Sequence, residues 1–133
     1  MSVTEYLRSS SLIITININD LDLEKIFNNT IPYTGGIELV QYHENIKYAD
    51  KMFFRNSLHV DNYNNKTRRY YKDCIEFAYP FQTIKMRKNG EITIPYFKNS
   101  ESTDKIIDYI FDILKVCGYD PKIINSLFIH HDI

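Results

Sequence analysis

Apolar and polar positions alternate with a period of two near the start of the chain. The even-numbered positions from Leu12 to Ile18 are all apolar, whereas the odd-numbered positions include Thr15 and Asn17. Side chains of a strand point alternately to its two faces, so this pattern predicts a strand with one apolar face and one mixed face. Another layer of the molecule must cover the apolar face.

Two stretches show helical spacing instead. Leu23, Ile26 and Phe27 form one apolar stripe on a short helix, which we expect Asn19 or Asp20 to cap. A longer stripe predicts a second helix, begun by Ser100 or Ser102 and ended by a left-handed residue at Gly118. Its apolar positions are Ile106, Ile110, Ile113, Leu114 and Cys117.

The clearest local signal is a hairpin between these helices. Ile84 and Met86 alternate with basic residues, Lys88-Asn89-Gly90 follows, and Ile92 and Ile94 then alternate with polar residues. Asn-Gly between two alternating runs predicts a hairpin because both residues tolerate positive φ.

Weaker patterns complete the predicted order of elements. Residues 37–42 form a short extended segment, residues 53–61 form a half-buried strand around Leu58 and Val60, and Ile123 to Ile129 forms a closing strand. We expect residues 1–10 to be a flexible arm and residues 11–133 to be one domain with an inserted loop at about 62–80. The fold class is therefore α+β: a curved antiparallel sheet with two helices packed on one face and the other face open.

Composition and charge restrict the classes of function that the chain can have. The chain has 133 residues, 44% of them hydrophobic, and a formal net charge of -1, so nucleic-acid contact requires a local basic patch. We find no segment apolar enough to span a membrane and no signal peptide, and expect an intracellular protein. Cys74 and Cys117 are expected to be reduced, buried thiols. No pattern indicates an enzyme, a cofactor or a metal site.

One stretch of the inserted loop combines positive charge with aromatic residues. Its basic residues Lys66, Arg68, Arg69 and Lys72 are interleaved with Tyr63, Tyr70 and Tyr71, a composition that suits phosphate contact with base stacking. The alternatives are a solvated loop, or tyrosines that pack on the domain.

The order of elements resembles one repeat of the TATA-box-binding protein. The segments that carry the resemblance are SLIITININDLDLEKI, IKMRKNGEITIPYFK and ILKVCGYDPKIINSLFIHHDI. They are similar to the opening strand and first helix, the central hairpin, and the long helix with the closing strand of that family. The chain also looks like the single-repeat relatives found in large DNA viruses.

This resemblance implies a saddle-shaped sheet whose open face lies on a widened DNA minor groove. A wedge phenylalanine falls on Phe53 or Phe54, but the second wedge falls on Arg87, and the Thr-Gly after the hairpin falls on Pro95-Tyr96. The chain departs from the family pattern at these last two places, which weakens the case for DNA bending. With the basic residues included, the candidate nucleic-acid-binding residues are Ser11, Ile13, Phe53, Phe54, His59, Lys66, Arg68, Arg69, Lys85 and Arg87.

Two functions follow as hypotheses. The first is a TATA-box-binding-protein-like transcription factor or accessory protein that contacts duplex DNA, in the host nucleus or a cytoplasmic viral factory if the protein is viral. The second is a protein-interaction module of the same fold without DNA contact, as a homodimer, with a second TATA-box-binding-protein-like subunit, or within a viral assembly. An open sheet face or an edge strand is a natural pairing surface.

Overall fold

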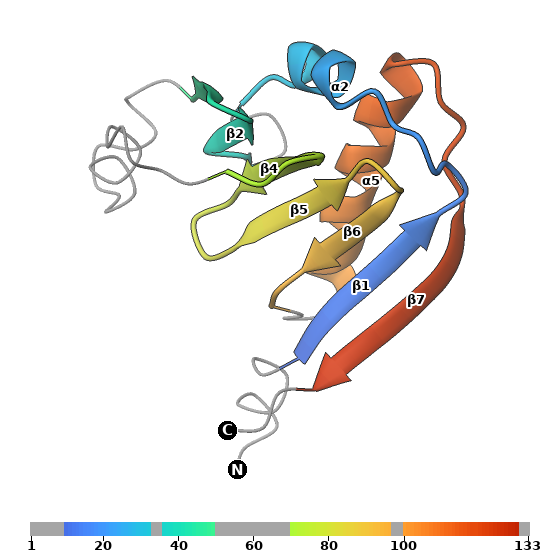
Figure 1. Cartoon of the computed structure of the whole chain (residues 1–133). Helices are drawn as coiled ribbons and strands as arrows, with labels where there is room; N and C mark the ends of the chain where they lie inside the picture. The colour runs from blue at the N-terminus through green and yellow to red at the C-terminus, as the bar shows by residue number, and fades with distance from the viewer. Residues whose placement is uncertain (1–9, 33–35, 50–69, 97–99, 131–133) are drawn as a thin grey trace.

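An antiparallel sheet carries the fold in the computed structural model of the chain (Figure 1). The structure describes residues 10–32, 36–49, 70–96 and 100–130. The strand expected at residues 53–61, most of the basic loop and residues 1–9 of the arm expected at 1–10 lie outside these ranges, whereas Ser10 is the first residue of a strand.

The described residues form seven strands and two helices, in agreement with the predicted α+β class. In chain order they are β1 (Ser10–Ile16), α2 (Leu23–Asn29), β2 (Leu39–Tyr42), β3 (Asn45–Tyr48), β4 (Cys74–Ala78), β5 (Thr83–Arg87), β6 (Glu91–Ile94), α5 (Ser100–Val116) and β7 (Ile123–His130). The sheet order is β3-β2-β4-β5-β6-β1-β7, and every neighbouring pair is antiparallel.

Both helices pack on the face of the sheet that the first strand was expected to bury. Leu12, Ile14 and Ile16 of β1 belong to one hydrophobic core with residues from both helices. α2 contributes Leu23, Ile26 and Phe27, and α5 contributes Ile110, Ile113, Leu114 and Cys117. The period-two and helical patterns are thus confirmed, and they meet in a single core.

The hairpin between β5 and β6 forms as predicted, but its turn uses the two residues differently from the expectation. Only Gly90 has positive φ, at 90°, and its N–H donates to the carbonyl of Arg87 over 3.0 Å. Asn89 instead accepts a hydrogen bond from the Glu91 N–H through its side-chain oxygen at 3.1 Å. The glycine therefore supplies the backbone conformation and the asparagine supplies a side-chain acceptor.

The end of α5 also agrees with the prediction. Gly118 has a φ of 94° and its N–H donates to the Lys115 carbonyl, while the Tyr119 N–H donates to the Leu114 carbonyl, each over 3.0 Å. These two bonds make a Schellman motif, which satisfies carbonyls that the helix end leaves without partners.

The start of α2 corrects one expectation. Asp22, and neither Asn19 nor Asp20, is the N-cap: its Oδ1 accepts a hydrogen bond from the Lys25 N–H over 3.1 Å. Leu23 is the first helical residue, so a cap at position 19 or 20 would lie too far from the first free N–H groups.

Removing this cap gives a first prediction. Asp22→Ala is expected to lower the free energy of unfolding by about 1 kcal/mol, the usual value of an N-cap hydrogen bond. The control is Asp20→Ala, which removes an exposed carboxylate 3.5 Å from Lys88 Nζ and is expected to cost less than about 0.5 kcal/mol. Urea unfolding of both variants measures the difference, and equal losses would argue against Asp22 as the cap.

The segment read as an inserted loop at about 62–80 contains a strand of the sheet. β4, at Cys74–Ala78, pairs with β2 on one side and with β5 on the other. All five of its side chains are buried. β3, at Asn45–Tyr48, follows β2 closely in the chain and pairs with it at one edge of the described sheet.

Candidate functional site

Four of the ten candidate nucleic-acid-binding residues lie in the described part of the chain. Ser11 and Ile13 are on β1, and Lys85 and Arg87 are on β5. The registers of the strands place all four on the face away from the helices. The others lie outside the described residues; they are Phe53, Phe54, His59, Lys66, Arg68 and Arg69.

One row of this face runs across the middle of the sheet. Ile13 lies opposite Thr93, which lies opposite Lys85, and Lys85 lies opposite Glu76 on β4. A carboxylate therefore occupies the position directly beside the lysine. The row mixes an aliphatic, a small polar and two charged side chains, and the sequence alone did not reveal Glu76 because β4 was not recognised.

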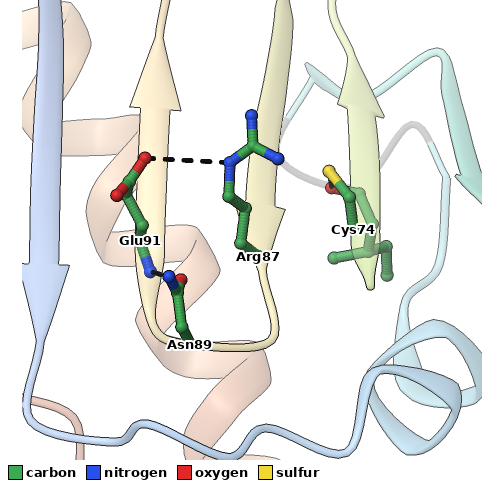
Figure 2. A network of polar contacts seen from close by, with 5 residues as sticks. Cys74, Arg87, Asn89 and Glu91 are labelled. Carbon is green, nitrogen blue, oxygen red and sulfur yellow. Dashed lines mark hydrogen bonds and ion pairs between the residues drawn. The ribbon is translucent and has the colours of Figure 1, made fainter. Parts of the chain in front are cut away.

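The second basic residue of this face also has an acidic neighbour. Arg87 Nε lies 3.7 Å from Glu91 Oε1, across the hairpin turn, as Figure 2 shows. The two cations of the described open face, Lys85 and Arg87, are thus matched by two carboxylates, Glu76 and Glu91. Such matching reduces the local positive potential that would attract a phosphate backbone. Glu91 could have been found from the sequence, because it follows the Lys88-Asn89-Gly90 turn.

Tyrosines at the end of the basic loop pack on the domain. Lys85 Nζ lies 4.2 Å from the centroid of the Tyr71 ring, a cation–π contact. The Tyr70 ring stacks on His43 in the turn between β2 and β3, with centroids 5.5 Å apart and planes 16° from parallel. This agrees with the alternative in which the loop tyrosines pack on the domain, although both rings keep an exposed side.

Part of the face expected to be open is buried. On β2 and β4 the side chains that point away from the helices are covered; they are Leu39, Gln41, Cys74, Glu76 and Ala78. Ser11 on β1 is also buried, and its hydroxyl donates to the Pro95 carbonyl over 3.0 Å. Ile13, Thr15, Lys85 and Thr93 are half-buried. The expectation of a bare face is therefore wrong for β2 and β4.

The two thiols are unsuited to nucleophilic chemistry. Both cysteines are free and buried, as expected. Burial raises the pKa of the Cys74 thiol, the nearby carboxylate of Glu76 adds to the rise, and Arg87 and Lys85 oppose it. Burial likewise raises the pKa of Cys117. A thiol with a raised pKa stays protonated at neutral pH and is a poor nucleophile.

A cavity of about 280 Å³ lies between α2 and the hairpin turn, and its walls are acidic. Two of its carboxylates already have structural partners, because Asp22 caps α2 and Asp20 lies beside Lys88. Within the described residues, no group of His, Cys, Asp and Glu side chains is arranged to hold a metal ion.

The edge strand β7 exposes several large apolar side chains. It is the last strand of the described sheet and pairs with β1 alone, as Figure 1 shows at the right-hand edge. Its large apolar side chains are between 36% and 65% exposed. They are Ile123, Ile124, Leu127, Phe128 and Ile129. From Ile123 to Ile129 the strand contains no charged residue.

The exposed apolar side chains lie on both faces of β7. Leu127 lies opposite Ile13 and Ile129 opposite Ser11, so these two share the face away from the helices. Phe128 lies opposite Leu12 and so points to the helix face. On this face of β7, Phe128 is 48% exposed.

The hydrogen bonds of β1 show which backbone groups of β7 point outward. The Ile16 N–H donates to Gly90, toward β6, whereas the Asn17 N–H donates to Lys122, toward β7. Since these directions alternate along a strand, the odd-numbered residues of β1 face β7. Their partners Asn125, Leu127 and Ile129 point inward, and the N–H and C=O groups of Ser126 and Phe128 point toward the edge of the sheet.

The other edge of the described sheet is different. β3 has only four residues, and Lys47 in its middle donates from Nζ to the Phe27 carbonyl over 2.6 Å, at the end of α2. Short edge strands with charged side chains discourage pairing with another chain. β7 has eight residues and neither of these protections.

Comparison with protein-family models, with curated proteins and with solved structures found no match. The resemblance to the TATA-box-binding protein therefore stays a prediction from the sequence. No helix among the described residues combines the length and apolar character that a membrane span requires.

Proposed function

We propose that this chain is a protein-interaction module that binds a partner by strand addition at β7. The observation that carries the proposal is an eight-residue edge strand with exposed apolar side chains on both faces. Strand addition gives such an edge a ladder of backbone hydrogen bonds and covers alternate side chains. The sheet and helices then serve to hold β7 in an extended conformation.

The energetics support a bound partner. Removing the remaining exposed surface of the five apolar side chains from water contributes on the order of 5 kcal/mol. The cost of association is of similar size, so backbone pairing along the outer edge of β7 has to supply part of the affinity. Edge strands of this length usually carry lysine, proline or a bulge; β7 contains no lysine or proline, and its register with β1 shifts near Ile124, at a bulge or irregularity.

Site-specific photocrosslinking in the cells that make the protein tests this proposal. A photoreactive amino acid at Leu127 is expected to give a discrete adduct with a partner protein. The matched control is the same amino acid at Phe81, which is 85% exposed but lies in the turn between β4 and β5. Adducts of equal yield at both positions, or none at Leu127, would contradict a role for β7 in binding.

A second candidate function is contact with duplex DNA through the half-buried strip of the open face. The observation in its favour is the row of Ile13, Thr93 and Lys85, where branched and small polar side chains stand beside a basic one. The resemblance to the TATA-box-binding protein assigns groove contact to this face. The carboxylates of Glu76 and Glu91 count against it.

Fluorescence anisotropy with a short A/T-rich duplex tests the second candidate. The variant Arg68→Ala/Arg69→Ala/Arg87→Ala is expected to bind more weakly, and each lost phosphate contact lowers the slope of log K against log salt by about 0.9. The control is Lys105→Ala, which removes an exposed positive charge from α5. No binding at low salt, or an equal loss in the control, would rule out this mode of contact.

A further inference from the structure

We propose that the exposed rings of Tyr70 and Tyr71 bind unpaired bases of a single-stranded nucleic acid by stacking. The two rings lie against the part of the sheet formed by β2, β4 and β5, whereas β7 is separated from β5 by β6 and β1. This binding site is therefore a second surface, distinct from the edge strand that carries the proposed function, and the two can be tested independently.

Tyr70 is the outermost ring of an aromatic series that begins in the core. Phe27 of α2 contacts Tyr42, with ring centroids 6.4 Å apart, and Tyr42 contacts His43 with centroids 4.3 Å apart. The Tyr70 ring then stacks on His43 with the two planes 16° from parallel. Tyr70 is 43% exposed, and because His43 occupies one face of its ring, the other face is the one open to a ligand. A base on that face would extend the series by one ring.

Tyr71 is held in place by a lysine of the sheet. Lys85 projects from the open face of β5, and its Nζ lies 4.2 Å from the centroid of the Tyr71 ring. The ammonium group occupies one face of this ring, and Tyr71 is 50% exposed. Both tyrosines are thus fixed on one side and open on the other. A ring that is already fixed loses little conformational entropy when a ligand binds.

The distance between the two rings selects the kind of ligand. Tyr70 lies at the turn that follows β2, Tyr71 lies beside Lys85 of β5, and β4 runs between these two strands. Neighbouring strands are about 4.8 Å apart, so the rings are about 10 Å apart. Successive bases along one strand of a duplex are only about 3.4 Å apart and stack on each other. A single strand whose bases are splayed apart can instead place one base on each ring.

The charges around the rings favour recognition of bases over recognition of phosphates. Glu76 lies opposite Lys85 on the neighbouring strand. Glu91 lies 3.7 Å from Arg87. These carboxylates weaken attraction of a phosphate backbone, but stacking depends on the π face of the base and needs no net positive charge. We therefore expect a shallow salt dependence, equivalent to about one or two phosphate contacts.

A proline-rich peptide is another ligand that binds exposed aromatic side chains. Such peptides lie in a groove lined by aromatic rings. Tyr70 and Tyr71 contact the sheet on opposite sides of β4, and so do not line one groove together. Two separate bases fit this arrangement better than a continuous peptide.

Fluorescence anisotropy of the full chain with labelled oligothymidylate of about twelve nucleotides tests the site. Tyr71→Ala and Tyr70→Ala are each expected to raise the Kd by about 5- to 150-fold, the loss of stacking on one base. Tyr71→Phe keeps the ring and should change the Kd less than about twofold. The matched control is Tyr96→Ala, which removes another tyrosine that is 50% exposed, after the end of β6. It should leave the Kd unchanged, and circular dichroism confirms that every variant is folded.

Three further probes identify the group that is bound. A strand of the same length without bases keeps the phosphates and is expected to bind the wild type at least about 25-fold more weakly, because both stacking contacts are lost. Thymidine monophosphate offers one base and is expected to bind at least about fivefold more weakly than the strand. Oligouridylate replaces the sugar, and tighter binding of either sugar form supports the proposal and identifies the strand as DNA or RNA.

Several outcomes would overturn the proposal. Equal binding of the strand without bases would mean that phosphates alone are recognised, and equal binding of thymidine monophosphate would mean a site for free nucleotides. Absence of oligothymidylate binding at low salt, or an equal loss in Tyr71→Ala and Tyr96→Ala, would also contradict it. If a proline-rich peptide binds through Tyr71 and the oligonucleotide does not, the rings form a peptide site. None of these results alters the crosslinking test at Leu127, so failure here leaves the proposed role of β7 standing.

Discussion

Gly90→Ala is expected to lower the free energy of unfolding by about 3–5 kcal/mol, among the largest effects of any single substitution. A Cβ atom at this position would lie 2.2 Å from the carbonyl oxygen of Ile18 and 3.2 Å from Ile16 Cγ1. The nearest of these is backbone and cannot rotate away. The hairpin turn would have to move, which would strain the hydrogen bond of 3.0 Å from the Ile16 N–H to the Gly90 carbonyl.

Gly118→Ala is the matched control for this substitution. Gly118 has almost the same φ, 94° against 90° at Gly90, but apart from its chain neighbours no atom of the described residues lies within 4 Å of the position of its Cβ. Its replacement should therefore cost only the conformational penalty of about 1 kcal/mol. Urea unfolding followed by far-ultraviolet circular dichroism measures both variants. Similar losses at the two positions would show that the contact with Ile18 is unimportant.

Phe77→Ala is expected to lower the free energy of unfolding by about 3–5 kcal/mol through the cavity that it leaves. Phe77 is fully buried on β4 and lies between Val40 on β2 and Ile84 on β5. All three side chains belong to the main core. Close packing on this face leaves no room for neighbours to fill the space without strain.

Phe81→Ala serves as the control for Phe77→Ala. It deletes the same side chain four residues later, where the ring is almost fully exposed, and should change stability by less than about 0.5 kcal/mol. Thermal unfolding of the two variants separates a core strand from a surface loop. If both variants unfold at the temperature of the wild type, β4 does not contribute to the core.

The parts of the fold that depend on local patterns could be predicted from the sequence. β1, the hairpin and α5 each show a period of two or 3.6 residues with a turn or cap residue at the end. The left-handed residue at Gly118 is a further example, because glycine is the usual residue at that place. The residues that determine each of these elements lie within about twenty positions of one another in the sequence.

β4 was missed for a physical reason. It is buried on both faces, so apolar residues at Ile75 and Phe77 alternate with Cys74, Glu76 and Ala78, and none of the five is exposed. From the sequence alone, the carboxylate of Glu76 in the middle of this run indicates a loop, because the neighbouring strands that bury it are not known. The position of the N-cap was missed because Asn19, Asp20 and Asp22 are all good capping residues.

The candidate site shows the same limit. The sequence placed Lys85 and Arg87 on the open face, but their acidic neighbours come from pairing between strands. It also predicted the closing strand at Ile123 to Ile129, yet gave no sign that the strand would lie at an edge. Edge position depends on the order of all strands in the sheet, which short patterns do not encode.

The position of β1 has a consequence during synthesis on the ribosome. Its two neighbours in the sheet, β6 and β7, both follow much later in the sequence. Roughly 75 further residues must therefore be synthesised after β1 before β6 is complete and can pair with it. At about 5–20 residues per second this delay is about 4–15 s. During that time β1 has no partner strand, and the apolar side chains of Leu12, Ile14 and Ile16 are not yet buried. This segment would then be a binding site for a chaperone that holds unfolded chains.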